Sequence, residues 1–148
     1  MAVAALEPRV VVLGHAAEEI LAAVDLHGAR PVIAADWAEG QSASLRAGIR
    51  ALGDVAAAVV VLGDQPRITG EAVAAVAAAE PPARAAYHGR PGHPVLLGRE
   101  LLDRAAELRG DSGFRDLLRG ARAVEIGGLA DPTDVDTPEE LGRLQPDP

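Results

Sequence analysis

The sequence predicts an α/β domain in which helices cover both faces of a mostly parallel sheet. Short continuous apolar runs alternate with segments of helical period along the chain, and strands buried on both faces have such runs. A length of 148 residues suits one domain, so we expect a single domain over residues 1–148. Apolar residues make up 49% of the sequence, but Trp, Tyr and Phe occur once each. The core is therefore expected to consist of Ala, Val and Leu, with helices packed closely on the sheet.

The first half of the chain alternates regularly between strand and helix patterns. Residues 10–13 are a continuous apolar run and predict the first strand. The next segment has helical period, with three apolar residues expected to face inward: Ile20, Leu21 and Val24. The alternation then predicts a strand over residues 31–34, a helix carrying Leu45, Ile49 and Leu52, a strand over residues 58–62, and a helix from Thr69 that carries Val73 and Val76.

The second half continues with shorter elements. Strands are predicted near residues 83–87 and 94–97, and a helix follows that carries Leu101, Leu102 and Leu108. Ser112 marks the start of a short helix that Gly120 ends and whose apolar residues are Phe114, Leu117 and Leu118. The last helix has the clearest start signal, because Thr137-Pro138-Glu139-Glu140 combines an N-cap, a proline at the first helical position and a capping-box glutamate.

Composition excludes several classes of function. Acidic residues outnumber basic residues by 22 to 14, and no basic cluster offsets the net charge of −8, so nucleic acid is not an expected partner. All 14 basic residues are arginine, and the absence of lysine excludes a Walker-type phosphate loop and a Schiff-base mechanism. The absence of cysteine excludes disulfides, thiolate nucleophiles and cysteine metal sites.

The sequence also sets expectations about location and cofactor. No apolar run approaches the roughly 20 residues that span a bilayer, and the first residues carry no basic region. We therefore expect a soluble cytoplasmic protein with no membrane partner. The fingerprint G-x-G-x-x-G does not occur, which disfavours an NAD-dependent dehydrogenase.

Four stretches are richer in glycine and polar residues than a connecting turn requires, and we place each at the end of a strand or helix: residues 40–45, 62–66, 89–94 and 134–139. Asp64 follows a predicted strand, and ligands of open α/β sheets bind at the carboxyl ends of strands. Asp64 and Asp136 together would offer two carboxylates to a Mg²⁺ ion that also holds phosphates, with Asp134 as an alternative ligand. The local alternatives are a turn-initiating aspartate for Asp64 and a helix-start charge for Asp136.

Six segments resemble one protein family, in this order: VVVLGHAAEEI, GQSASLRAGI, VVVLGDQP, GRPGHPVLL, RGDSGFRDLL and DVDTPEEL. Together they resemble the MobA-like nucleotidyltransferase family, and within it the molybdenum cofactor cytidylyltransferases. The resemblance implies a Rossmann-like three-layer α/β/α nucleotidyltransferase fold. It also implies Mg²⁺-dependent transfer of a nucleoside monophosphate, CMP from CTP in this branch, to a phosphorylated acceptor such as molybdopterin cofactor, with release of pyrophosphate.

The resemblance assigns roles to three groups of residues. Asp64 and Asp136 are the expected catalytic residues and would hold Mg²⁺. The expected nucleotide-binding residues are Gly40, Gln41, Ser42 and Ser44, and the expected acceptor-binding residues are Gly92, His93, Gly110 and Asp111. The local alternative for the nucleotide-binding residues is an ordinary serine N-cap. The local alternative for His93 is a structural histidine in a tight turn. Arg46 is expected on the helix surface.

The sequence departs from the family at its beginning. The family opens with a strand and a glycine-rich loop of the form L-A-A-G-x-S-x-R-M-G, followed by a lysine, and neither occurs in these residues. We expect the sequence to begin after them, as an N-terminally shortened form of the fold. The alternative to an active transferase is therefore a non-catalytic nucleotide-binding or assembly module. Because the missing strand would lie centrally in the sheet, a partner chain or a second copy of this chain is expected to cover the gap.

Overall fold

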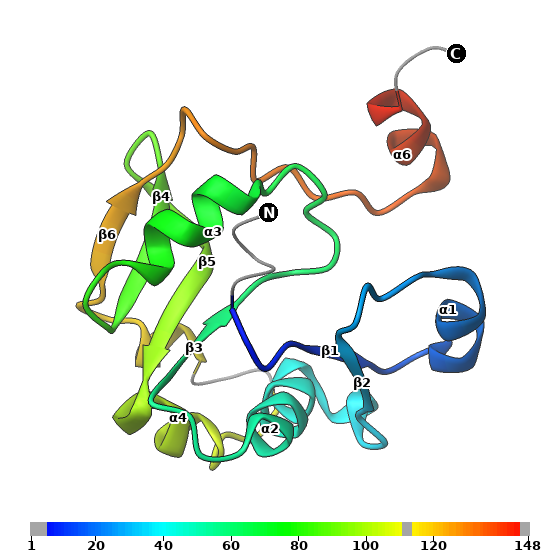
Figure 1. Cartoon of the computed structure of the whole chain (residues 1–148), viewed down its shortest axis with the longest axis horizontal. Coiled ribbons are helices and arrows are strands. Elements are labelled where there is room, and N and C mark those ends of the chain that lie inside the picture. Colours follow the sequence, from blue (N-terminus) through cyan, green and yellow to red (C-terminus); the bar gives the residue numbers. More distant parts are fainter. Residues whose placement is uncertain (1–5, 111–113, 146–148) are drawn as a thin grey trace. The chain divides into compact units, whose positions relative to one another are not determined.

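The computed structural model describes residues 6–110 and 114–145. This part of the chain divides into two compact units. Unit 1 holds residues 59–96 and 121–145, and unit 2 holds residues 6–58, 97–110 and 114–120. Figure 1 labels most of their helices and strands and colours them along the sequence. None of the described helices combines the length and the apolar character needed to cross a membrane.

Unit 2 contains a parallel pair of strands with helices packed on it. The strands are β1 (Val10–Leu13) and β2 (Arg30–Ile33), and the register aligns Val10 with Arg30. The helices are α1 (Ala17–Ala23), α2 (Gln41–Leu52), α4 (Arg99–Ala105), α5 (Phe114–Leu117) and the short 3₁₀ helix η2 (Trp37–Glu39). Helix α2 packs against β1, β2 and α4, and its buried residues include Ala43 and Ile49. The predicted first strand and the second helix are thus confirmed.

Two apolar positions of unit 2 differ from the prediction. Val24 does not face inward but is 50% exposed. Helix α1 ends at Ala23, and Val24 has extended backbone, so the helical period no longer sets its direction. Leu108 lies beyond the end of α4 at Ala105, although Leu101 and Leu102 are buried as predicted.

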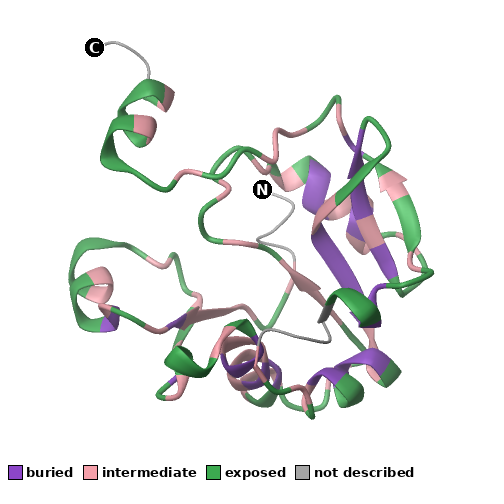
Figure 2. Cartoon of the chain, turned by 180° about the vertical axis from the view of Figure 1, so that it is seen from behind, coloured by how far each residue is buried: buried purple, intermediate pink, exposed green. Residues whose placement is uncertain are grey.

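A second sheet has the strand order β3, β5, β4, β6, with bounds Ala57–Val60, Arg90–Gly98, Ala83–Tyr87 and Arg122–Glu125. Helix α3 (Gly70–Ala77) packs on β4, and the Thr69 hydroxyl caps it by accepting a hydrogen bond from Ala72 N–H. The buried core of unit 1 consists of Ala72, Val76, Ala83, Ala85, Tyr87, Leu96 and Ile126. Figure 2 shows these buried positions concentrated on α3, β4 and β5.

The sheets are mixed in direction. The pairs β1/β2 and β4/β6 are parallel, whereas β4 and β5 form an antiparallel hairpin. Its two central turn residues, His88 and Gly89, both have positive φ (52° and 82°), as a type I′ hairpin turn requires. Within the described residues, β1 and β3 each lie at one end of their sheet. The expectation of a further central strand stays a prediction.

Residues 89–94 begin in the hairpin turn at the end of β4, as the sequence suggested, and continue into the first half of β5. The register pairs Arg84 with Val95 and Ala85 with Gly92, which leaves His93 and Pro94 as a bulge. A bulge bends a strand and redirects its side chains. Strand β6 was not predicted, because its sequence Arg-Ala-Val-Glu has only a weak strand pattern and it pairs with β4 alone.

The hairpin turn is held by one carboxylate from β6. Glu125 accepts hydrogen bonds from the backbone N–H groups of His88 (2.8 Å), Gly89 (3.0 Å) and Gly127 (3.0 Å). These bonds lower the pKa of Glu125, with the Gly89 bond as the largest cause and those of His88 and Gly127 next. The ionised carboxylate therefore stabilises the turn.

We expect Glu125→Gln to lower the free energy of unfolding at neutral pH. A carboxyl whose pKa is lowered by folding contributes stability that is present above its unfolded pKa and is lost as the pH falls through its folded pKa. The urea midpoints of the variant and the wild type should therefore differ at neutral pH and converge in acid well below the ordinary pKa of 4.5. A difference that does not change with pH would contradict this role of the charge.

Gly14, directly after β1, has no room for a side chain. A Cβ atom there would lie 2.6 Å from Trp37 Cβ and 2.9 Å from Trp37 Cγ. We expect Gly14→Ala to destabilise the protein by about 1–3 kcal/mol, the usual cost of overpacking, in urea denaturation. Gly128→Ala is the matched control, because a Cβ at Gly128 meets no heavy atom within 4 Å. Equal midpoints for the two variants would contradict the close approach of Gly14 and Trp37.

Candidate active site

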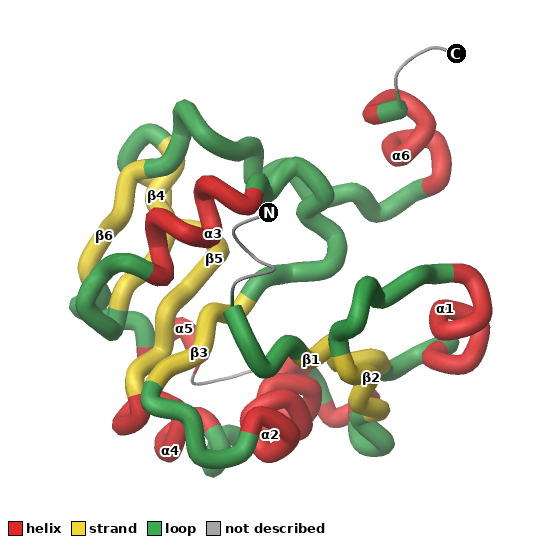
Figure 3. The backbone as a smooth tube through the Cα atoms, viewed as in Figure 1, coloured by secondary structure: helices red, strands yellow, loops and turns green. Residues whose placement is uncertain are grey.

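In unit 1, two loops run antiparallel and are hydrogen-bonded to each other along their length. We call them the loop pair: residues 64–69, which follow β3, and residues 129–135, which precede the last helix. At one end, Val135 N–H donates to the Asp64 carbonyl at 2.8 Å. At the other end, the Thr69 hydroxyl donates to the Leu129 carbonyl at 2.8 Å. Figure 3 shows that both segments have neither helix nor strand structure, so these contacts define their course.

Side chains connect the loop pair between its two ends. Gln65 Nε2 donates to the Pro132 carbonyl at 3.1 Å and to Asp134 Oδ1 at 2.9 Å. Arg67 forms an ion pair with Asp131 at 3.2 Å. The pKa of Asp131 is lowered, first by the hydrogen bond from the Thr133 hydroxyl and also by Arg67. The sequence alone did not identify Gln65 or Arg67, because their partners lie more than 60 positions away.

The loop pair makes the backbone segments of Asp64 and Asp136 neighbours in space. Asp136 directly follows Val135, whose N–H is bonded to Asp64. Both aspartates are exposed, and neither carboxylate accepts a hydrogen bond or forms an ion pair with another described residue. Their oxygen atoms are thus available to a ligand. Among the described residues, however, no group of three or more acidic or histidine side chains is placed to hold a metal ion.

Asp136 lies just outside helix α6 (Pro138–Leu144). The Thr137 hydroxyl accepts a hydrogen bond from Glu140 N–H at 3.2 Å, and the Glu140 carboxylate accepts from Thr137 N–H at 3.1 Å. The predicted capping box is therefore confirmed. Glu140 also accepts from Asp136 N–H at 2.8 Å, which fixes the backbone of Asp136 and leaves its carboxylate exposed.

A cavity of about 230 Å³ adjoins the end of the loop pair. Its lining residues are Thr133, Asp134, Val135, Glu140, Arg143 and Leu144. This volume is below the roughly 300–1,000 Å³ of pockets that enclose a small organic ligand. The cavity alone therefore does not accommodate a nucleotide, but it lies at the acidic end of the loop pair.

His93, on the β5 bulge, is in electrostatic range of the same acidic residues. Burial is the main cause that lowers the pKa of His93, and Arg84 lowers it further, whereas Asp64 and Asp134 act in the opposite direction. The Tyr87 hydroxyl donates to the His93 carbonyl at 2.6 Å and holds the bulge in place. Gly92 is also constrained by Tyr87, because a Cβ at Gly92 would lie 3.0 Å from its ring.

The residues expected to bind the nucleotide lie in unit 2, at the start of α2. Gly40 precedes the helix with φ 119° and ψ −179°, a conformation that favours glycine. Gln41 is exposed and Ser44 is half-buried. Ser42 is only 3% exposed, and its hydroxyl accepts a hydrogen bond from Arg46 Nη1 at 3.1 Å. Its side chain therefore faces the protein interior.

Arg46 is not on the helix surface, as the sequence suggested, but is only 4% exposed. Its guanidinium pairs with Asp36 at 3.1 Å and Glu39 at 3.5 Å, and it also donates to Ser42 and to the Leu108 carbonyl. The helical spacing of residues 42, 46 and 49 puts Arg46 on the same face as Ser42 and Ile49, a signal that could have revealed its burial.

The expected site residues thus lie in both units. Unit 1 holds Asp64, Asp136, Gly92 and His93, and unit 2 holds Gly40, Gln41, Ser42, Ser44 and Gly110. Ser42 N–H donates to the Gly110 carbonyl at 3.4 Å, so one expected acceptor-binding residue contacts the expected nucleotide segment. Asp111 lies outside the described residues.

A family model described as the MobA-like NTP transferase domain matches residues 1–126. The chain belongs to this family. A curated relative is nicotine blue oxidoreductase of Paenarthrobacter nicotinovorans, 32% identical over 150 residues, which span 91% of this chain and 74% of the relative.

Solved mycobacterial structures match this MobA-like domain over 94% of its length. The crystal structure of Rv0371c from Mycobacterium tuberculosis H37Rv is 28% identical, with a TM-score of 0.78 over 75% of that chain. A homologue of Rv0371c from Mycobacterium sp. strain JC1 is 32% identical, with a TM-score of 0.76 over 74% of that chain. A structure of Rv0371c in complex with manganese is 28% identical, with a TM-score of 0.76 over 77% of that chain.

These matches confirm the predicted fold class, a Rossmann-like nucleotidyltransferase fold with mixed α/β structure. The family is one of NTP transferases, which agrees with the resemblance found in the sequence. A divalent metal has been observed with one relative, Rv0371c.

Proposed function

We propose that this MobA-like domain transfers CMP from CTP to a phosphorylated acceptor of the molybdopterin class and releases pyrophosphate. The observation that carries the proposal is the hydrogen bond from Val135 N–H to the Asp64 carbonyl, because Asp136 directly follows Val135 and both aspartates have exposed side chains. The family match supports nucleotidyl transfer, and the serine-containing segment at residues 40–44 supports the cytidylyl branch.

The donor atoms at the loop pair suit Mg²⁺. This ion prefers oxygen ligands and usually takes only one or two carboxylates, with water and substrate phosphates completing its coordination. Asp64 and Asp136 would hold it, and no third protein ligand is required. When bound, Mg²⁺ neutralises charge that develops on the phosphates during transfer.

The remaining residues act by binding and orientation. Gln65 fixes the loop that carries Asp64, through its bonds to Pro132 and Asp134. The segment at Gly40 to Ser44 would contact the nucleotide, and His93 with Gly92 would contact the acceptor. Catalysis would then come from the alignment of the two substrates rather than from a protein nucleophile.

The test is a transfer assay with the 148-residue chain, CTP, Mg²⁺ and molybdopterin cofactor. We expect pyrophosphate release that requires both Mg²⁺ and the acceptor and that is faster with CTP than with GTP. Binding of CTP without transfer would instead favour the non-catalytic nucleotide-binding module. Transfer from GTP alone would contradict the cytidylyl assignment.

A second candidate is oxidation or reduction of nicotine blue, because one relative at 32% identity is named nicotine blue oxidoreductase. The test is the change in absorbance of nicotine blue when the chain is added together with an electron donor or acceptor. A rate that depends on protein concentration would favour this candidate. The absence of such a rate, together with pyrophosphate release from CTP, would reject this second candidate.

A further inference from the structure

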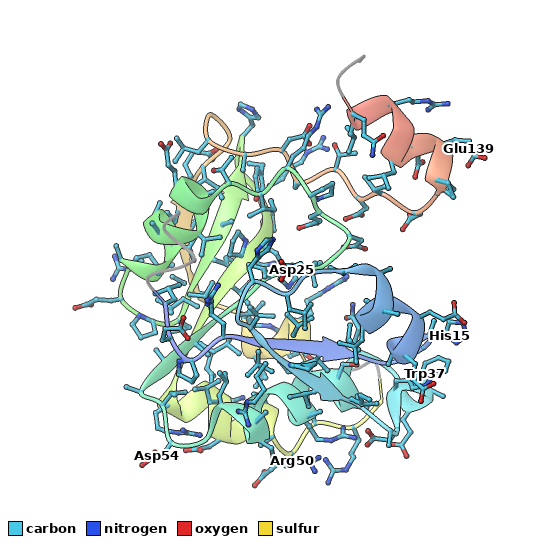
Figure 4. All side chains as sticks on the ribbon, turned by 45° about the vertical axis from the view of Figure 1, so that its right-hand side comes forward. His15, Asp25, Trp37, Arg50, Asp54 and Glu139 are labelled. Atoms are coloured by element: carbon cyan, nitrogen blue, oxygen red, sulfur yellow. The ribbon has the colours of Figure 1, made fainter. Side chains whose placement is uncertain are left out.

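Unit 2 carries an aromatic pair at the carboxyl ends of its two parallel strands. His15 lies two residues after the end of β1, and Trp37 follows the end of β2 and begins η2. Their ring centroids are 5.3 Å apart, and the ring planes meet at 64° in an edge-to-face arrangement. Figure 4 labels both side chains and shows them next to each other. Ligands of parallel α/β sheets bind at this end of the strands.

Trp37 is held in place but remains open to solvent. Its Cβ and Cγ pack against Gly14, where a Cβ atom would come within 2.6 Å of the tryptophan. The backbone N–H of Trp37 donates to the Ala34 carbonyl at 3.2 Å. Nevertheless, 43% of the residue is exposed, and it is the only aromatic residue among the exposed large hydrophobic residues of the described chain. Packing against Gly14 therefore fixes the base of the side chain, while a large part of the residue remains accessible to a ligand.

The aromatic pair adjoins the segment that the proposed function assigns to the nucleotide. Gly40 N–H donates to the Trp37 carbonyl at 3.2 Å, so the ring and the start of that segment share one turn. The acidic residues on either side of Trp37, Asp36 and Glu39, are paired with the buried Arg46. This pairing reduces the negative charge that would repel a phosphorylated ligand, because one guanidinium faces the two carboxylates.

We propose that Trp37 and His15 form a stacking surface for a planar heteroaromatic ring, supplied by the base of the nucleotide or by a pterin. The inference rests on the proposed function and adds to it the contact that recognises the ring. An exposed aromatic side chain offers a face on which any nucleobase can stack, with little dependence on the hydrogen-bonding pattern of the base. Selection among bases would then come from the adjacent backbone groups.

The chain has a single tryptophan, so its fluorescence reports on Trp37 alone. The protein is titrated with CTP, GTP, a free pterin and inorganic triphosphate, and free tryptophan amide is titrated in parallel to correct for absorption. We expect saturable quenching by at least one compound that carries a ring and none by inorganic triphosphate. Quenching by a nucleotide would identify the base as the stacked ring, and quenching by the pterin alone would identify the acceptor.

Variants provide the second arm, and all are measured by calorimetry because the two Trp37 variants lack the fluorophore. Trp37→Leu should weaken binding of the quenching ligand by about 5- to 150-fold, the range for loss of one base stack. Trp37→Phe should retain most of the affinity, and Val24→Ala is the matched control at a 50% exposed apolar residue of the same unit. If the wild type bound a nucleotide without quenching, and Trp37→Leu bound it with the same affinity, the stacking surface would be rejected but the proposed function would not. No binding of any compound to folded protein would reject both.

Discussion

Asp64→Ala is expected to lower the rate of nucleotidyl transfer by about 10²–10³, the loss typical of one preorganised group that stabilises developing charge. The side chain is exposed and makes no hydrogen bond to another described residue, whereas the bond from Val135 goes to the backbone carbonyl, which alanine retains. Stability should therefore change by less than about 0.5 kcal/mol. The measurement is kcat for pyrophosphate release, with urea denaturation alongside.

Asp54→Ala is the matched control for Asp64→Ala. The Asp54 side chain is fully exposed, and its nearest basic atom, on Arg99, lies 3.9 Å away. Asp54→Ala removes the same charge as Asp64→Ala but does not alter the loop pair, so transfer should proceed at the wild-type rate. Equal rates for Asp64→Ala and the wild type would contradict the metal-binding role of Asp64.

Arg46→Met is expected to destabilise the protein by about 2–3 kcal/mol. Removing one partner of a fully buried ion pair costs about 3–5 kcal/mol, but Asp36 and Glu39 are partly exposed, which reduces the loss. The variant also leaves the Ser42 hydroxyl and the Leu108 carbonyl without their guanidinium donor. The free energy of unfolding in urea measures the effect.

Arg50→Met provides the comparison for Arg46→Met. Arg50 lies one turn later in α2 and is exposed, so methionine there changes the net charge equally but removes no buried contact. The free energy of unfolding of Arg46→Lys should fall between those of the two methionine variants. An ammonium group keeps the charge but cannot reach several acceptors as a guanidinium does. If both methionine variants unfolded at the same urea concentration, the buried contacts of Arg46 would not matter for stability.

Local patterns were sufficient for several of the regular elements of the fold. The apolar run at residues 10–13 gave the correct bounds of β1. The helix predicted from Thr69 is α3, and the N-cap predicted at Thr137 marks the start of α6. Such signals act over a few residues, because capping and burial depend on neighbours in the sequence. The position of Asp64 after β3 followed from the same reasoning.

Contacts over long sequence distances could not be read from these patterns. Strand β6 exists because it pairs with β4, and the loop pair depends on Gln65 meeting Asp134. The burial of Arg46 requires Leu108 from another part of unit 2. The bulge at His93 depends on the register with β4. In each case, the residue type is compatible with a surface turn or helix, and only the distant partner determines the structure.

The most direct test of the central claim is a calorimetric titration of the 148-residue chain with CTP and GTP, each with and without Mg²⁺. The carboxylates of Asp64 and Asp136 are the proposed ligands of Mg²⁺, and the segment at residues 40–44 is the proposed contact of the base. Binding of CTP should therefore require Mg²⁺ and be lost in Asp64→Ala, and the affinity for CTP should exceed the affinity for GTP. Folded protein that binds neither nucleotide, or binds CTP equally well without Mg²⁺, would contradict the account.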